Sequence, residues 1–307
     1  MERIAYAGWH NCLRLSNDHI ELIVTADIGP RIIRFGFVGG ENEFAEYPAM
    51  LGQKGGDEWR IYGGHRLWHA PEDPQRSYYP DNEPVQVKAI HGGLRVTQPI
   101  ETTTGIGKEM DIRLVGGSAR VSIVHRLRNH GLWPVKLAPW ALSVMAPGGK
   151  AILPLPARGA WPETLLGTQT ITLWPYTDMS DPRWTWGRQY ILLQQDSQRD
   201  NPQKIGLTGS EGWLAYARKG HLFLKTYTHI PGATYPDLGC GVEVYTSPAM
   251  LELETLGPLT LLPPGGLVEH SEQWWLYQGV PVPLTEHDVE STVTPQAQQA
   301  RQEAGGS

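Results

Sequence analysis

The feature that most constrains this chain is a long succession of short segments in which apolar and polar side chains alternate. Clear examples are residues 85–88, 93–97 and 108–114. Alternation with a period of two is the pattern of half-buried strands, whereas amphipathic helices repeat every 3.6 residues. Turn-forming residues separate the segments, and the 307 residues include 35 Gly and 25 Pro, which interrupt long helices. The sequence therefore predicts an all-β protein with antiparallel strands and few short helices.

The strand pattern continues through most of the chain, so we predict one large domain over residues 1–284. Within it, residues 146–205 lose the alternation and are rich in Pro and Trp. We predict a long irregular region there that could wall a cleft, since long loops inside compact domains are commonly functional. Residues 285–307 become polar and are predicted to form a terminal helix or a disordered tail.

Composition narrows the range of partners. The net charge is −6 with a pI near 6.0, and no run of Lys or Arg is present, so nucleic acid is not an expected partner. Neither a signal peptide nor a membrane span is evident in the sequence, which predicts a soluble, cytoplasmic protein without a membrane partner. Cys12 and Cys240 are the only cysteines, and their spacing matches neither a disulfide framework nor a zinc site.

The aromatic residues are mainly Trp and Tyr, with twelve of each against four Phe. Both side chains combine a flat apolar face with a polar group, which suits stacking on sugar rings. Most of these residues are expected to fill the core. The excess of Trp and Tyr over Phe nevertheless favours a neutral or weakly polar substrate, either a small molecule or an oligosaccharide.

Polar and aromatic residues are densest in two neighbouring stretches, 62–72 and 78–83. A glycine pair opens the first stretch and prolines interrupt both, so the side chains are expected on a loop or strand end, where binding residues are commonly displayed. Turn chemistry alone would also explain Asp81. The candidates for binding or chemistry are His65, Arg66, Trp68, His69, Glu72, Tyr79, Asp81 and Asn82.

A second group of candidates lies far along the chain, in the segment 250–254. Its alternation places Glu252 and Glu254 on one face of a strand and leucines on the other. On a concave face such a carboxylate could act as a general base held by a rigid strand. On an outer face both would simply be solvated. Glu243 and Tyr245 share a strand face and could extend the same polar wall.

Short motifs at the two ends of the chain carry a family resemblance. They are Gly29-Pro30-Arg31-Ile32 and the later Gly-Gly-His-Arg segment, then Leu253-Glu254-Thr255, the turn at 261–266 and the strand ending in Glu272-Gln273-Trp274-Trp275. In this order they resemble the galactose mutarotase (aldose 1-epimerase) superfamily over residues 10–280, and in detail the uncharacterised DUF4380 type. The resemblance implies a large antiparallel β-supersandwich with a concave sugar site. It also implies that Glu254 is the general base and that Arg66 binds the sugar.

The chain departs from that superfamily at the residue expected to act as the general acid. A histidine is expected near residues 137–142, but none is present and Trp140 occupies the nearest position. An indole can only donate a hydrogen bond, so simple mutarotation is not implied. Trp140 is instead a candidate for substrate binding, together with Arg66, Trp68, Tyr79, Asp81, Asn82, Glu243 and Glu252.

Several alternatives for the missing acid remain open. His65 or His69 could supply it, because histidine titrates near neutral pH. Glu72 or Glu243 could act as the acid with Glu254 as base or nucleophile, which would make the protein a glycoside hydrolase. His65, His69 and Glu72 could instead bind a divalent metal, and no other cofactor is expected. A sugar-binding module without catalytic activity is the remaining alternative.

Overall fold

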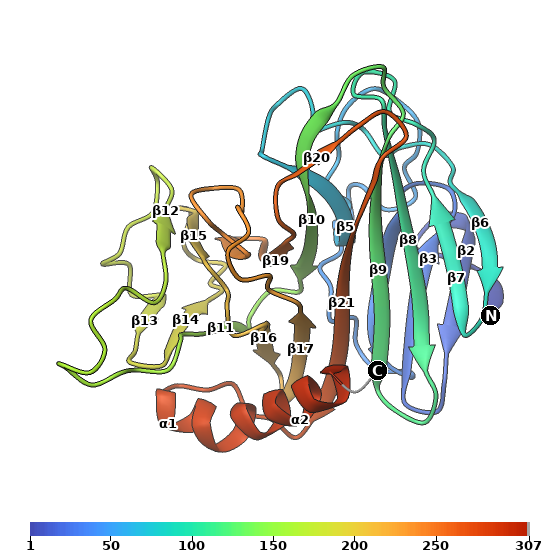
Figure 1. The fold of residues 1–307 in the computed structure, drawn as a ribbon. Helices are drawn as coiled ribbons and strands as arrows, with labels where there is room; N and C mark the ends of the chain where they lie inside the picture. The colour runs from blue at the N-terminus through green and yellow to red at the C-terminus, as the bar shows by residue number, and fades with distance from the viewer. Residues whose placement is uncertain (306–307) are drawn as a thin grey trace.

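The alternating segments pair into two antiparallel sheets in the computed structural model, which describes residues 1–305 (Figure 1). The first sheet contains, in spatial order, β1 (Glu2–Tyr6), β2 (Trp9–Ser16), β3 (Ile20–Thr25), β4 (Arg31–Phe37), β5 (Gly64–Ala70), β10 (Val135–Met145), β19 (Met250–Leu256), β18 (Val242–Ser247), β15 (Gln203–Leu207) and β12 (Ile171–Leu173). A short strand beside this path, β20 (Thr260–Leu262), pairs with β10. The second sheet contains β13 (Trp184–Trp186), β14 (Tyr190–Gln194), β11 (Lys150–Pro154), β16 (Trp213–Arg218), β17 (His221–Tyr227), β21 (Leu267–Gln278), β9 (Arg120–Asn129), β8 (Ile106–Val115), β7 (Gly93–Thr97) and β6 (Gln86–Ile90).

The main core lies between the two sheets, where each strand presents the apolar members of its alternating pairs. Phe35 of β4 and the neighbouring Phe44 meet Phe223 of β17 and Trp274 of β21, with ring centroids between 5.4 and 6.1 Å apart. Such edge-on and tilted contacts are the favoured geometry of buried aromatic rings. The two packed antiparallel sheets confirm the predicted all-β supersandwich.

The end of the chain is helical and covers the outer face of the second sheet (Figure 1). It comprises α1 (Glu286–Asp288), the π-helical turn η1 (Val289–Val293) and α2 (Thr294–Gly305). Thr285 and Asp288 form a capping box at the start, and a stripe of small apolar residues at 289, 293, 297 and 300 packs on the sheet. Residues 306–307 of the predicted tail lie outside the described residues. No helix within residues 1–305 has the length and apolar character needed to cross a bilayer.

The irregular region predicted for residues 146–205 is wrong in part, because β11, β12, β13 and β14 lie within it and β15 begins in it. Three of these strands, β11, β14 and β15, are buried along nearly their whole length. Strands buried on both faces consist of continuous apolar runs and lose the alternation by which strands are found in a sequence. The segments between these strands remain loops, and one of them walls the cleft described below.

Gly63 and Gly64 allow the chain to enter β5 against its neighbours. Their φ angles are +96° and +72°, and a Cβ on Gly64 would lie 2.3 Å from the carbonyl oxygen of Ile32. Glycine alone adopts such a conformation at so close an approach without strain. Because β5 pairs with β4 through Ile32 and His65, this contact sets the register in which the site-bearing strand begins.

We expect Gly64→Ala to destabilise the protein more than Gly117→Ala, which is its matched control. Gly117 has a similar φ of +70° but nothing within 4 Å of its added Cβ. Both substitutions place Ala in the left-handed region at a cost of about 1–2 kcal/mol, whereas only Gly64→Ala adds an overlap with backbone, worth about 1–3 kcal/mol more. Urea unfolding of the two variants measures the difference, and equal losses would contradict the close approach.

Candidate functional site

A cavity of about 510 Å³ opens on the face of the first sheet that is turned away from the core. Residues of β5, β10, β15, β18 and β19 line it, and loop residues Trp59, Tyr78, Trp174 and Tyr176 add aromatic walls. A cavity of about 440 Å³ at the outer surface of the second sheet has no aromatic residue in its lining. Concave, largely aromatic surfaces with a few convergent polar groups are typical ligand sites, so the first cavity, called the cleft below, is the candidate site.

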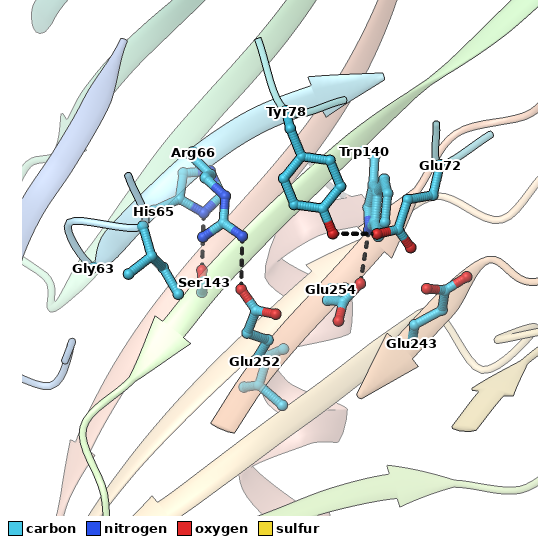
Figure 2. A network of polar contacts seen from close by, with 12 residues as sticks. Gly63, His65, Arg66, Glu72, Tyr78, Trp140, Ser143, Glu243, Glu252 and Glu254 are labelled. Atoms are coloured by element: carbon cyan, nitrogen blue, oxygen red, sulfur yellow. Dashed lines mark hydrogen bonds and ion pairs between the residues drawn. The ribbon is translucent and has the colours of Figure 1, made fainter. Parts of the chain in front are cut away.

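Arg66 is placed in the cleft by the alternation of β5. Its Nη2 donates to Glu252 Oε1 at 2.8 Å, and its guanidinium lies over the rings of Trp68 and Trp59, 4.6 and 5.7 Å from their centroids. Figure 2 shows Arg66 and Glu252 facing each other from β5 and β19. Within the described residues, Nε and Nη1 of Arg66 are buried without a hydrogen-bond partner. A bound molecule with hydroxyl or carbonyl oxygens could accept from both.

Glu254 follows Glu252 on the same face of β19 and lies just beneath the cleft. It is fully buried, and its Oε2 accepts from Trp140 Nε1 at 2.8 Å (Figure 2). The same oxygen accepts from Lys204 Nζ at 3.4 Å. Its Oε1 is buried without a partner among residues 1–305. Burial, opposed by Lys204, raises the pKa of Glu254 to about 7. This carboxyl is therefore poised to exchange a proton near neutral pH.

Lys204 of β15 joins Glu254 to a third carboxylate. Its Nζ forms an ion pair with Glu243 Oε2 at 2.7 Å and lies 4.9 and 4.5 Å from the ring centroids of Trp140 and Trp174. Glu243 and Glu254 are directly opposed across β18 and β19. The two carboxylates raise the pKa of Lys204, which stays an ammonium, while burial raises the pKa of Glu243. The ammonium of Lys204 neutralises one carboxylate only. The site therefore favours a proton on either Glu243 or Glu254, because one positive charge then faces one negative charge.

Glu72 and Tyr78 are lining residues that lie beyond the end of β5. Tyr78 donates its hydroxyl proton to Glu72 Oε1 at 2.5 Å (Figure 2). Burial and this carboxylate raise the pKa of the Tyr78 hydroxyl, so it stays protonated. Glu72 therefore faces the same cleft as Arg66 and Glu252.

His65 and His69 alternate with Arg66 on β5 and point to the opposite side of the sheet. His65 contacts Ser143 Oγ at 2.8 Å, and His69 Nε2 lies 3.5 Å from Glu101. This placement corrects the expectation that either histidine supplies an acid beside Glu254. It also separates both from Glu72, so the three do not form the predicted metal site. Burial lowers the pKa of both histidines, which keeps them neutral.

The interior side of β5 holds a different polar cluster with the donor atoms of a metal site. Single ligand atoms of His65, His125 and Glu272 lie within 4.8 Å of one another. The two histidine Nε2 atoms are hydrogen-bonded at 2.7 Å, and Glu272 is paired with Lys225 at 2.9 Å and accepts from Trp274 Nε1. Lys225 already neutralises the only carboxylate, so a buried divalent cation would add uncompensated charge. This donor set fits a structural hydrogen-bond network better than a metal site.

The three site residues predicted in the second stretch support loops instead of lining the cleft. Their side chains bind other parts of the protein, and only the Tyr79 contact is exposed. Asn82 also donates to the backbone oxygens of residues 56 and 58, which fixes the loop that carries Trp59. The side-chain contacts are Tyr79 with Thr102 at 3.3 Å, Asp81 with Arg31 at 2.7 Å and Asn82 with Tyr62 at 2.8 Å.

The sequence did not single out Trp59, Trp174, Tyr176 and Lys204 as site residues, although all four line the cleft. Trp174 and Tyr176 lie in the Pro- and Trp-rich region that was predicted to wall a cleft. The available signal for Lys204 in the sequence was a lone cation beside the apolar residues Ile205 and Leu207. Such a residue is rarely buried unless it is paired.

Comparison with known proteins supports the fold. No family model matches the chain, and no curated protein matches it. It is similar to the solved structure of a putative aldose 1-epimerase from Klebsiella pneumoniae subsp. pneumoniae, with 12% identity, 96% of this chain and 86% of that chain covered, and a TM-score of 0.62. A galactose mutarotase-like protein from Lactobacillus casei gives 9% identity, 87% and 100% coverage, and a TM-score of 0.55.

A TPR-domain containing protein from Parabacteroides distasonis is also similar, with 14% identity and a TM-score of 0.57. The match covers 89% of this chain but 48% of that one, so this chain spans about half of that protein. At these identities the likeness concerns the fold alone. The chain has the galactose mutarotase-like fold.

We expect one glutamate carboxyl to titrate near pH 7. Burial favours the neutral acid of Glu254, which is protonated below about pH 7 and ionised above it. Carbon NMR of protein labelled at the glutamate carboxyl carbon should show a resonance with this midpoint, and Glu254→Gln should remove it. If every resonance titrated in the ordinary range near 4.3, the proposed burial effect would be wrong.

We expect the Arg66 and Glu252 ion pair to show strong coupling in a double-mutant cycle. Arg66→Met or Glu252→Gln alone leaves one buried charge without its partner and should cost about 3–5 kcal/mol. The double variant should lose less than the sum of the two by about 0.5–3 kcal/mol. Urea unfolding at neutral pH measures all four free energies, and additive losses would show that the pair does not interact.

Proposed function

We propose that this protein is a carbohydrate-active enzyme of the aldose 1-epimerase type, with Glu254 as its general base. The observation that carries the proposal is a fully buried carboxyl with a pKa of about 7 and one free oxygen, set beneath an aromatic cleft. A base is most effective when its pKa lies near the working pH. The finer assignments, to the DUF4380 type and to the cytoplasm, remain predictions from the sequence.

The lining of the cleft suits a sugar ring. Trp59, Trp68, Trp140 and Trp174 offer flat apolar faces, on which the C–H faces of a pyranose can pack. The two free donors of Arg66 can bind sugar hydroxyls, and Glu252 can accept from them. The cleft volume of about 510 Å³ falls within the usual range for small-ligand sites.

The proposed reaction interconverts the two anomers of a free aldose. Glu254 takes the proton of the anomeric hydroxyl while the bond between the anomeric carbon and the ring oxygen breaks, and the ring oxygen gains a proton. The open-chain aldehyde then turns about its carbon–carbon bond and closes on its other face. Glu254 Oε1 has no partner among residues 1–305 and is the oxygen that takes the proton of the anomeric hydroxyl, while Oε2 keeps its contacts with Trp140 and Lys204.

A glycoside hydrolase is the second candidate, favoured by the direct opposition of Glu243 and Glu254 on neighbouring strands. Such an enzyme would use one as acid and the other as base or nucleophile. Release of the chromophore from nitrophenyl glycosides would support it. Binding of sugars without turnover of any kind would favour a non-catalytic module.

We expect Glu254→Gln to slow anomer interconversion by about 10²–10⁴-fold, the usual contribution of a general base. Polarimetry of freshly dissolved α-glucose, α-galactose and other common aldoses measures the rate against buffer alone. The wild-type rate should rise with pH through about 7, because the base must be ionised. Glu83→Gln is the matched control, since Glu83 is exposed and does not line the cleft. Wild-type rates equal to buffer on every aldose would refute the proposed function.

A further inference from the structure

The epimerase reaction needs an acid for the ring oxygen, and few groups in the cleft can provide a proton. Arg66 does not lose its proton in proteins. Tyr78 donates its hydroxyl proton to Glu72. Within residues 1–305, the side chains that hydrogen-bond to Glu254 are Trp140 and Lys204, and not Tyr176 or Tyr245. Besides Arg66, the cationic residue that lines the cleft is Lys204. Trp140, in the position nearest to the expected histidine, has no proton to exchange at neutral pH.

Lys204 lies beside the proposed base. It lines the cleft, and its Nζ contacts the oxygen Oε2 of Glu254 at 3.4 Å. The rings of Trp140 and Trp174, with centroids 4.9 and 4.5 Å away, hold the ammonium by cation–π contact. The ammonium of Lys204 also forms an ion pair with Glu243 of the neighbouring strand β18 at 2.7 Å.

We propose that Lys204 is the general acid of this site, an inference that rests on the proposed epimerase function. As the bond from the anomeric carbon to the ring oxygen breaks, Lys204 gives a proton to that oxygen and Glu254 takes one from the anomeric hydroxyl. When the aldehyde closes again, the returning hydroxyl gives its proton back to Lys204, and Glu254 returns its proton to the carbonyl oxygen. Each group ends as it began, and no other reactant is needed.

Glu243 is a positioning residue in this scheme. It is fully buried, and its ion pair is with Lys204 Nζ, which lines the cleft, so in this scheme it acts through Lys204. Gly206 stands opposite Glu243 across β15 and β18, and a Cβ there would lie 3.3 Å from Glu243 Cγ and 2.3 Å from Cys240 Sγ. The backbone thus leaves room for a carboxylate whose ion pair, within residues 1–305, is with the proposed acid.

The inference predicts a pH profile unlike that of an enzyme with a histidine acid. The flanking carboxylates raise the pKa of Lys204, so the ammonium persists well above neutral pH. Activity should therefore rise through about pH 7 as Glu254 ionises and then stay level into the alkaline range. A histidine acid would lose its proton near pH 6.5 and give a falling limb there.

The experiment is polarimetry of the full chain with Lys204→Met, Lys204→Arg and, as control, Lys88→Met. Lys88 is exposed on β6, away from the cleft. Sugar affinity is measured in parallel by quenching of tryptophan fluorescence. We expect the first two variants to lose about 10²–10⁴-fold in rate, the usual contribution of a general acid. Lys204→Arg should keep sugar affinity within about threefold, because the positive charge is retained. Added methylamine should partly restore the rate of Lys204→Met.

The outcomes separate this inference from the function on which it rests. If the wild type interconverts anomers but Lys204→Arg stays within about threefold of its rate, Lys204 is not the acid and the epimerase proposal stands. A falling limb near neutral pH in an active wild type would overturn the inference in the same way. If the wild type is inactive on every aldose, the function itself fails and the inference fails with it. Loss of rate in both variants, with rescue by methylamine and retained affinity in Lys204→Arg, supports the assignment.

Discussion

The structure depends on charged side chains that are buried in pairs. The strands that carry the cleft have almost no solvent-exposed residue, and β5 and β19 are buried along their whole length. An ionised group in such a place is tolerated only with a partner. Arg66 is paired with Glu252 and Lys204 with Glu243, each across neighbouring or nearby strands of the first sheet. The cleft is therefore a set of charge pairs fixed by strand register, and its polarity follows from the pairing of the sheet.

The same strands build two separate polar regions, because successive side chains point to opposite faces. On β5, Arg66 and Trp68 face the cleft, whereas His65 and His69 face the space between the sheets. A shift of one residue in register would exchange the two sets. The glycine pair before β5 therefore matters to the site as well as to the fold, since it sets where the alternation starts.

The sequence predicted most of the fold and several of the residues that line the cleft. Alternation found the antiparallel strands and placed Glu252 and Glu254 on one face, which the structure reproduces. Alternation also places His65 and Arg66 on opposite faces of their strand. The high density of polar residues in the stretch 62–72 nevertheless suggested that they form a single cluster. Lys204 was not predicted as a site residue, because its contacts with Glu243 and Glu254 are formed by strand pairing between segments that are distant in the sequence. Such neighbours carry no local pattern, so only the folded sheet identifies them.

The arrangement around Glu254 gives its two oxygens different roles. Trp140 and Lys204 both bind Oε2, whereas Oε1 has no partner among the described residues. Two donors on one oxygen fix the orientation of the carboxylate and leave the other oxygen to accept a proton. An indole suits this duty, because it donates at every pH and never competes for the proton. Trp140 occupies the position nearest to the histidine that the family resemblance implies, so the proposed proton chemistry falls to groups on other strands. Lys204 is the cation that the fold places beside Glu254.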